Sequence, residues 1–302
     1  MTFKSAAILI FVTVLWGFNF TVIEVGLQDM PPFLLASFRF LLAFFPAVLI
    51  VPPPQCSFRL IAAFALFSGI GQFSLLFFGI QLGASSGLAS VLLQSQVFFS
   101  IIISFFVFGE RINGLTGVGL VLAVIGASVI LVVNSGSPTF VGIVFLLAAA
   151  LCWSIANIVT KKAGAVNMIS FIVWTSAVPI IPLFMAALVT NGQAVVRHSI
   201  MEIDAIEILC LIYLGYVTTL FGYGLFSQMI KQHGVSKVAP FTLAVPVFGL
   251  IFSYLIFGDR LSSPELIGVG LIMLGLVSIV LLPKLQVSKP AVKSSRTAPR
   301  NV

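Results

Sequence analysis

Residues 87–112 read GLASVLLQSQVFFSIIISFFVFGERI, and this stretch decides the fold class. Residues 87–108 carry no charge, and about 20 consecutive apolar residues are enough for a helix to cross the hydrocarbon core of a bilayer. Glu110 and Arg111 then end the apolar run with a pair of charges. The stretch therefore predicts one transmembrane helix with a polar boundary at its end.

Similar apolar runs lie on both sides of this stretch. The predicted spans are residues 6–27, 33–51, 60–80, 87–108, 115–133, 140–160, 168–189, 208–230, 238–257 and 264–282. The composition agrees, because 60% of the 302 residues are hydrophobic and 8% are charged, against about 25% charged residues in a soluble domain. The first run continues to about Leu27 without a cleavage site, which favours an uncleaved span over a signal peptide. We expect an all-α membrane protein of ten transmembrane helices.

Short motifs recur in the same order in the two halves of the chain. The sequence Phe-Gly-Glu-Arg-Ile at 108–112 matches Phe-Gly-Asp-Arg-Leu at 257–261, and Gly-Val-Gly-Leu occurs at 117–120 and again at 268–271. These matches predict two five-helix repeats, residues 5–133 and 140–282, followed by a basic tail at 283–302. Since five is odd, the second repeat must enter the membrane inverted, and inverted repeats are typical of secondary transporters.

The distribution of Lys and Arg predicts the orientation of the chain. With the N-terminus in the cytoplasm, 12 of the 15 positive residues fall on the cytoplasmic side, and only Arg197 and Arg260 fall outside. Arg39 lies within a span. By the positive-inside rule we expect a multi-pass plasma (inner) membrane protein with both termini cytoplasmic. The net charge of +7 then reflects loops and tail, and no nucleic-acid partner is expected.

Two charged residues inside or near the spans are candidates for function, since charges in lipid are costly unless partnered. Arg39 lies about two turns into the second span. One interpretation is that it binds a substrate carboxylate or phosphate in a cavity; the others are snorkelling to the outer interface or pairing with Glu24 or Asp29. Glu24 is a candidate for proton coupling or for a gate, against a role in an ion-pair strut.

Uncharged polar residues supply the other candidates. In the fourth span, Ser90 and Gln94 share a helix face, whereas Gln96 is turned by roughly 200° from Gln94. A regular helix thus predicts Ser90 and Gln94 in the cavity and Gln96 bonded to a neighbouring helix. Pro246 frees a carbonyl and is a candidate hinge or gate in the ninth span. The remaining candidates, for which bonding between helices is the alternative to substrate binding, are Trp16, Asn19, Gln72, Trp153, Asn157 and Tyr223.

The chain offers little for an enzyme. Residues 83–87, Gly-Ala-Ser-Ser-Gly, match the G-x-S-x-G nucleophile elbow, but that motif needs a preceding strand and a nearby histidine. His198 and His233 are the only histidines, and both fall in predicted loops. No P-loop or metal-ligand motif is present. We expect no enzyme activity, cofactor or metal; an intramembrane enzyme and a non-transporting scaffold remain the competing classes.

Several of these residues resemble the EamA branch of the drug/metabolite transporter superfamily over residues 5–282. They are Trp16 to Phe20 (Trp-Gly-Phe-Asn-Phe), the pair Arg39-Phe40, and the apolar-Gly-acid-Arg endings at 108–111 and 257–260. Family members often carry a proline within both the fourth and the ninth span. This chain keeps Pro246 but reads Leu-Gln-Ser-Gln at 93–96, a departure that resembles the bacterial O-acetylserine/cysteine exporters.

The resemblance implies a secondary transporter that exports small amino-acid metabolites, such as cysteine or O-acetylserine, by alternating access. The alternative is a multidrug or hydrophobic-amine exporter of the same superfamily, for which cavity carboxylates would be expected. The expected partners are a small-molecule substrate and the lipid bilayer, with a homodimer as one candidate assembly.

Overall fold

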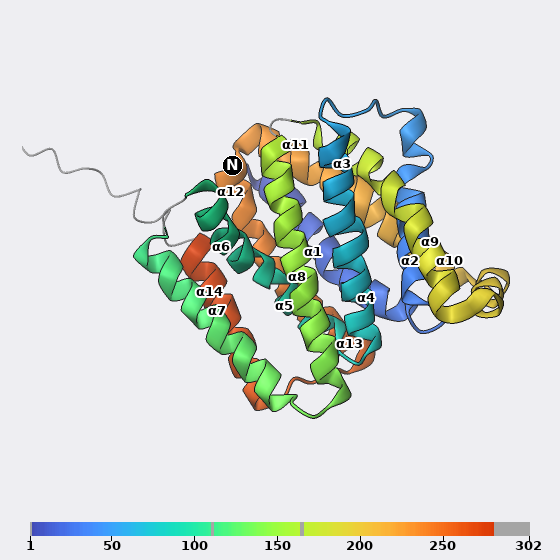
Figure 1. Ribbon diagram of the computed structural model, residues 1–302. Coiled ribbons are helices and arrows are strands. Elements are labelled where there is room, and N and C mark those ends of the chain that lie inside the picture. Colours follow the sequence, from blue (N-terminus) through green and yellow to red (C-terminus); the bar gives the residue numbers. More distant parts are fainter. Residues whose placement is uncertain (1, 110–111, 164–165, 281–302) are drawn as a thin grey trace, which may run out of the picture.

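The computed structural model describes residues 2–109, 112–163 and 166–280, and within them all regular structure is helical (Figure 1). Ten helical stretches of this part of the chain are long and apolar enough to cross a membrane. This confirms the prediction of an all-α, ten-span membrane protein. The predicted charged boundary at Glu110 and Arg111 and the basic tail lie outside the described residues.

The first half contains five of these stretches. They are α1 (Phe3–Gly26); α2 (Pro32–Phe44) with a 3-10 turn (Ala47–Leu49); α3 (Phe58–Phe64), a π-helical segment (Ala65–Gln72) and α4 (Phe73–Gln81); α5 (Ser86–Leu92), a 3-10 turn (Leu93–Ser95) and α6 (Gln96–Phe108); and α7 (Gly114–Val133). The third and fourth spans are thus continuous helices with an irregular segment in the middle.

The second half has a similar order of elements, without the 3-10 turn of the second span. It contains α8 (Pro138–Ala163); α9 (Met168–Met201); α10 (Ala205–Ile212), a π-helical segment (Tyr213–Gly222) and α11 (Tyr223–His233); α12 (Val235–Val238), a 3-10 segment (Ala239–Ala244) and α13 (Val245–Phe257); and α14 (Ser263–Val280). The third and eighth spans both carry a π-helical segment, and the fourth and ninth both carry a 3-10 segment.

Short polar side chains and glycines set the helix ends. Ser85 caps α5 by accepting a hydrogen bond from the backbone N–H of Leu88 at 3.2 Å, which gives the G-x-S-x-G motif a structural role. Gly109 and Gly258 end α6 and α13 with φ of 66° and 71°, a left-handed conformation that glycine adopts without strain. The glycines of the repeated Phe-Gly endings are therefore helix C-caps.

The helix of the seventh span, α9, is longer than the sequence predicted. Residues 168–189 were the expected span, but α9 continues to Met201 across a kink at Gly192, whose φ of 81° and ψ of 155° are not helical. Asn191 and Gln193 flank this glycine and end the apolar run. The loss of hydropathy at these polar residues therefore placed the predicted end of the span before the kink. In the structure the backbone is helical again after the kink.

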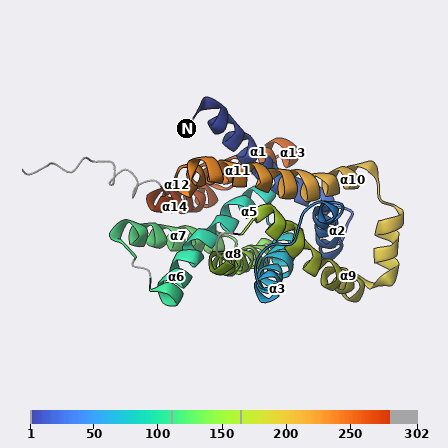
Figure 2. The same cartoon turned by 90° about the horizontal axis from the view of Figure 1, so that it is seen from above.

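The helices contact one another in matching pairs. Helix α1 packs on α13 and on the π-helical segment of the eighth span, and α8 packs on α6 and on the π-helical segment of the third. Helices α7 and α14 lie side by side at one end of the bundle, and α9 and α10 lie at the other (Figures 1 and 2). The interior of the bundle is thus formed by spans from both halves.

Glycines allow the close approach of α7 and α14. A Cβ atom on Gly126 would lie 2.5 Å from the carbonyl oxygen of Gly268, and one on Gly275 would lie 2.6 Å from that of Gly119. Close backbone packing through small residues is the usual basis of helix association in lipid. The outward face of α7 is apolar instead, with Val121 exposed by 59%, as expected for contact with lipid.

Candidate functional site

A cavity of about 240 Å³ lies between the two halves of the bundle. Its walls come from eight spans, the first to fourth and the sixth to ninth. Eight of the predicted site residues line it: Trp16, Asn19, Arg39, Gln72, Gln94, Trp153, Asn157 and Tyr223. The structure therefore brings together polar side chains that are far apart in the sequence.

All four irregular segments of the third, fourth, eighth and ninth spans border this cavity. Gln72 is the last residue of one π-helical segment and Tyr223 directly follows the other. Gln94 and Thr242 belong to the two 3-10 segments. Irregular backbone is tolerated at membrane depth where it lines a cavity, and π-helical segments are frequent at functional sites. The backbone geometry thus marks the same place as the polar side chains.

Arg39 is buried at the cavity wall, with 5% of its surface exposed. Its Nη1 and Nη2 atoms donate to Asn19 Oδ1 and Thr219 Oγ1, both at 3.3 Å. The guanidinium carbon lies 4.2 Å from the centroid of the Phe73 ring, a cation–π contact. Its Nε is buried without a hydrogen-bond partner.

Two of the three interpretations of Arg39 are therefore wrong. Burial rules out a side chain that snorkels to an interface, and within the described residues neither Glu24 nor Asp29 pairs with the guanidinium. The arginine is a cation in a low-dielectric site and is held by neutral groups. Two of its five N–H groups donate to these partners, and three remain. Such a group gains most from an anion that enters the cavity.

Gln96 also lines the cavity, contrary to the facing expected for a regular helix. Successive residues of the 3-10 turn at 93–95 are rotated by about 120°, instead of about 100° in an α-helix. Two such steps bring Gln94 and Gln96 to about 120° apart around the helix axis. In a regular α-helix they would be about 160° apart, which is the rotation of roughly 200° measured the shorter way round. Gln96 does bond a neighbouring helix as expected, because Asn157 Nδ2 donates to its Oε1 at 2.6 Å. Gln94 Nε2 donates to the carbonyl oxygen of Thr242 at 3.4 Å.

Ser90 and Pro246 lie in the contact between α5 and α13 and not among the residues that line the cavity. The Ser90 hydroxyl donates to the carbonyl oxygens of Gly87 at 2.7 Å and Pro246 at 3.4 Å. Pro246 is in the first turn of α13, where proline costs no intrahelical bond. It follows the 3-10 segment directly and so stands at the junction where the ninth span changes its helix type.

Glu24 also lies outside the cavity lining, and its partner is a backbone group. Its Oε2 accepts a hydrogen bond from the N–H of Ser86 at 2.9 Å, at the start of α5. A carboxyl oxygen at this place satisfies a backbone N–H that has no partner within the helix. Within the described residues Glu24 forms no ion pair, so an ion-pair strut is not what the structure shows there.

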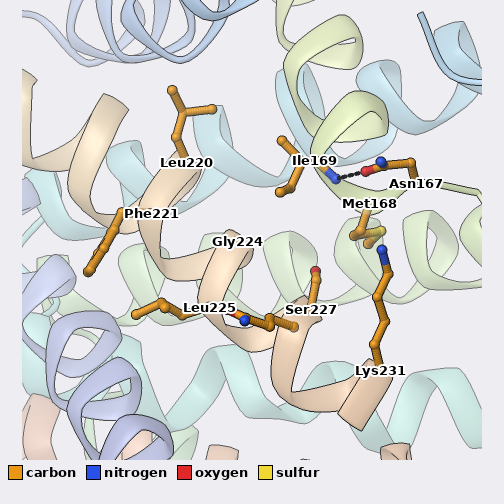
Figure 3. A pocket seen from close by; sticks show the side chains of 10 residues that line it. Asn167, Met168, Ile169, Leu220, Phe221, Gly224, Leu225, Ser227 and Lys231 are labelled. Carbon is orange, nitrogen blue, oxygen red and sulfur yellow. Dashed lines mark hydrogen bonds between the residues drawn. The ribbon is translucent and has the colours of Figure 1, made fainter. Parts of the chain in front are cut away.

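A second hollow, a groove of about 440 Å³, lies between the start of α9 and α11 (Figure 3). Lys231 extends from α11 toward Met168 at the start of α9, and Gly224 leaves space between the two helices (Figure 3). Met168 lines both the groove and the cavity. Met168 is not among the predicted site residues, since an apolar residue near the end of a span carries no signal of its own.

These features, a multi-pass helical bundle with a polar cavity built from both halves, define the architecture of a membrane transporter. The model of the EamA-like transporter family matches residues 4–132 and again residues 140–281. The chain therefore belongs to the EamA-like transporter family.

Curated relatives agree with this assignment. A probable amino-acid metabolite efflux pump of Escherichia coli (strain K12) is 39% identical over 91% of this chain and 94% of its own length. A protein of Salmonella typhimurium with the same description is 38% identical over the same shares. A solved crystal structure superposes with a TM-score of 0.61 over 95% of this chain and 99% of its own, at 15% identity. That structure supports the fold alone.

Proposed function

We propose that this chain is a secondary exporter of small amino-acid metabolites and that Arg39 binds the substrate carboxylate. The observation that carries the proposal is the charge balance of the cavity. Among its described lining residues Arg39 is the one charged group, and its Nε has no partner. A carboxylate in the cavity would supply the missing countercharge and would accept from the N–H groups of Nη1 and Nη2 that Asn19 and Thr219 do not use. The description of the relatives as amino-acid metabolite efflux pumps supports the same substrate class.

The same charge balance argues against the alternatives. A hydrophobic-amine exporter needs an anionic group for its cation, and no Asp or Glu is among the described residues that line the cavity. For an enzyme, the serine motif at 83–87 would have to supply a nucleophile, but Ser85 serves as a helix cap. We therefore propose transport without chemical change of the substrate.

Alternating access between two inverted repeats, residues 5–133 and 140–282, is the proposed mechanism. Three observations support it: the family model matches each half, both halves carry π-helical and 3-10 segments in the same order, and the contacts between spans recur in matching pairs. Because such repeats form one site at their interface, rocking can expose that site to each side in turn. We place both termini in the cytoplasm of a cell with this protein in its plasma membrane.

Counterflow in proteoliposomes tests the substrate class. L-Cysteine and O-acetyl-L-serine, in mildly acidic buffer where the ester does not rearrange, should exchange with labelled L-cysteine. Their methyl esters, which keep the ammonium and lack the carboxylate, should compete at least about 10-fold less well, as expected for the loss of a hydrogen-bonded charge pair. Equal competition by the esters, or preferential exchange of amines, would overturn the proposal.

Cysteine labelling tests the inverted arrangement. In a background without native cysteines, single cysteines at Asn113 and Ser262 should lie on opposite sides of the membrane, because they occupy corresponding loops of the two repeats. An impermeant thiol reagent added from outside should then label only the second. Equal labelling of both positions in intact cells would exclude the inverted repeat.

A further inference from the structure

We infer that the groove between the start of α9 and α11 binds one anionic phospholipid, with its phosphate at Lys231 and an acyl chain along Leu220 and Phe221. This site lies beside the substrate cavity, and only the choice of leaflet, the cytoplasmic one, rests on the orientation proposed above. Three features of the groove point to this occupant: its length, the order of its apolar and polar residues, and its charge.

The groove has the length of one leaflet. Leu220 lies near the middle of the eighth span, Ala205–His233, and Lys231 lies near the end of that span. The two residues are 11 positions apart, which corresponds to about 16 Å along a helix. Half of a hydrocarbon core about 30 Å thick has nearly the same length. An acyl chain whose headgroup lies beside Lys231 would therefore reach Leu220.

The groove also has the polarity of a lipid. Along it, the residues of α11 change from apolar near the membrane centre to polar near its surface: Leu220, Phe221 and Leu225, then Ser227, Gln228 and Lys231. Phe221 is exposed by 51% and Ile169, on the opposite wall, by 39%, so the hollow is open at the surface of the bundle. Because the bilayer core holds no water, an acyl chain is the group that fills an apolar hollow at this depth.

The charge of the groove favours an anionic lipid over a zwitterionic one. Lys231 is exposed, and no acidic residue is among the described residues that line the groove. Lysine binds phosphate as a point charge, and basic pockets between transmembrane helices bind anionic headgroups. The choline group of phosphatidylcholine would find no acid here. We therefore expect phosphatidylglycerol to bind more tightly than phosphatidylcholine.

Met168 connects the lipid site with the cavity, because it lines both. Lys231 extends toward Met168, whereas Leu220 lies farther along the groove (Figure 3). A polar substrate that entered beside Lys231 would reach Met168 without using the apolar part at Leu220, so an acyl chain accounts better for that part. A bound lipid would contact Met168 from the membrane side and support the cavity wall there.

Native mass spectrometry of the purified full-length protein tests the inference. We expect dioleoyl-phosphatidylglycerol to bind at least about 5-fold more tightly than dioleoyl-phosphatidylcholine, the effect of about one lysine near the membrane surface. Lys231→Gln should remove this preference. The matched control is Lys4→Gln, because Lys4 is exposed and outside the groove, and its neighbour Ser5 hydrogen-bonds to His233 of α11 at 2.8 Å. It therefore removes the same charge from the same end of the bundle and should keep the preference. Equal binding of the two lipids by the wild type, or a preference that survives in Lys231→Gln, would overturn the inference.

Gly224→Leu provides a second test that leaves the charge unchanged. A Cβ atom on Gly224 would meet only Ile169 Cδ1, at 3.8 Å, so the larger side chain has room and occupies the groove. We expect at least about 5-fold weaker binding of phosphatidylglycerol and an unchanged melting temperature in detergent without lipid. Gly270→Leu on α14 is the matched control, since a Cβ atom there meets nothing within 4 Å and the residue lies outside the groove. It should bind lipid like the wild type. Normal lipid binding by Gly224→Leu, or its conversion from dimer to monomer, would overturn the inference; the second result would assign the groove to another copy of the chain.

Counterflow in phosphatidylcholine liposomes separates lipid from substrate. Because the inference places no substrate in the groove, Gly224→Leu and the wild type should exchange L-cysteine at the same rate in these liposomes. Selective loss of exchange by Gly224→Leu would make the groove a substrate path and overturn the inference. Absence of exchange in the wild type, with lipid binding as expected, would instead count against the proposed function and leave the lipid site supported.

Discussion

Replacement of Arg39 should separate substrate binding from stability. The Arg39→Gln side chain is neutral, so a bound carboxylate loses a charged hydrogen-bond partner worth about 1.5–3 kcal/mol, which corresponds to roughly 10- to 150-fold in affinity. Arg39→Lys keeps the charge but loses the planar, two-point contact. We therefore expect Arg39→Lys to fall between the wild type and Arg39→Gln.

The stability of the same variants should change little or improve. The structure gives Arg39 two hydrogen bonds of 3.3 Å and one ring contact at 4.2 Å, each worth about 1 kcal/mol, or about 2 for a desolvated ring contact. Against these stands a desolvation cost of several kcal/mol for a buried ion. Removing the charge should thus leave the melting temperature unchanged or raise it, the expected signature of a residue kept for function.

The assay pairs thermal unfolding in detergent with counterflow in proteoliposomes. Arg59→Gln is the matched control, because Arg59 is exposed at the start of α3 and outside the cavity. It should change neither quantity. A lower melting temperature for Arg39→Gln with unchanged substrate affinity would refute the reasoning and assign Arg39 to the scaffold.

Three further predictions follow from single contacts. Gly126→Ala places a Cβ atom 2.5 Å from a carbonyl oxygen of α14 and should lower the yield of folded protein. The control Gly117→Ala meets nothing within 4 Å and should leave the yield unchanged. Fluorescence-detected size-exclusion chromatography measures the yield of both variants. Glu24→Gln retains an oxygen for the N–H of Ser86 and should fold normally. If this variant loses transport driven by a proton gradient but keeps substrate exchange, Glu24 is the coupling acid. If it keeps both activities, Glu24 does not have that role. Gln96→Leu leaves an amide N–H without its acceptor, a cost of about 1–3 kcal/mol, so both melting temperature and substrate affinity should fall; an unchanged melting temperature would show that this hydrogen bond contributes nothing.

The number and type of the spans could be predicted from the sequence because the bilayer imposes a length and a polarity on each helix. The same constraint identified much of the cavity. Asn19, Gln72 and Asn157 stood out as polar side chains in apolar runs, and the structure places each at the cavity wall. Polar groups in lipid need partners, so they collect where spans from both halves meet.

The facing of the fourth span could not be predicted in this way. A sequence pattern assigns faces only if the helix is regular, and the 3-10 turn before Gln96 changes the rotation at the position that matters. Two of the three interpretations of Arg39, snorkelling and pairing with an acid, were wrong for a related reason. Its partners are neutral: Asn19 comes from the preceding span and Thr219 from the eighth. From the sequence, only the acidic residues Glu24 and Asp29 were considered as partners.

The irregular segments themselves connect the site to the movement that transport requires. Breaks in helix type occur in the third, fourth, eighth and ninth spans, and each break supplies or adjoins a residue of the cavity, namely Gln72, Gln94, Tyr223 and Thr242. Regular helices α7 and α14 instead pack through glycine contacts at the edge of the bundle and contribute nothing to the cavity lining. Because a π-helical or 3-10 turn has fewer well-formed hydrogen bonds to lose than an α-helical one, a span bends at such a turn at lower cost. In the proposed mechanism, substrate that binds beside these turns would bias their geometry directly, and the two halves would rock about the proposed carboxylate site.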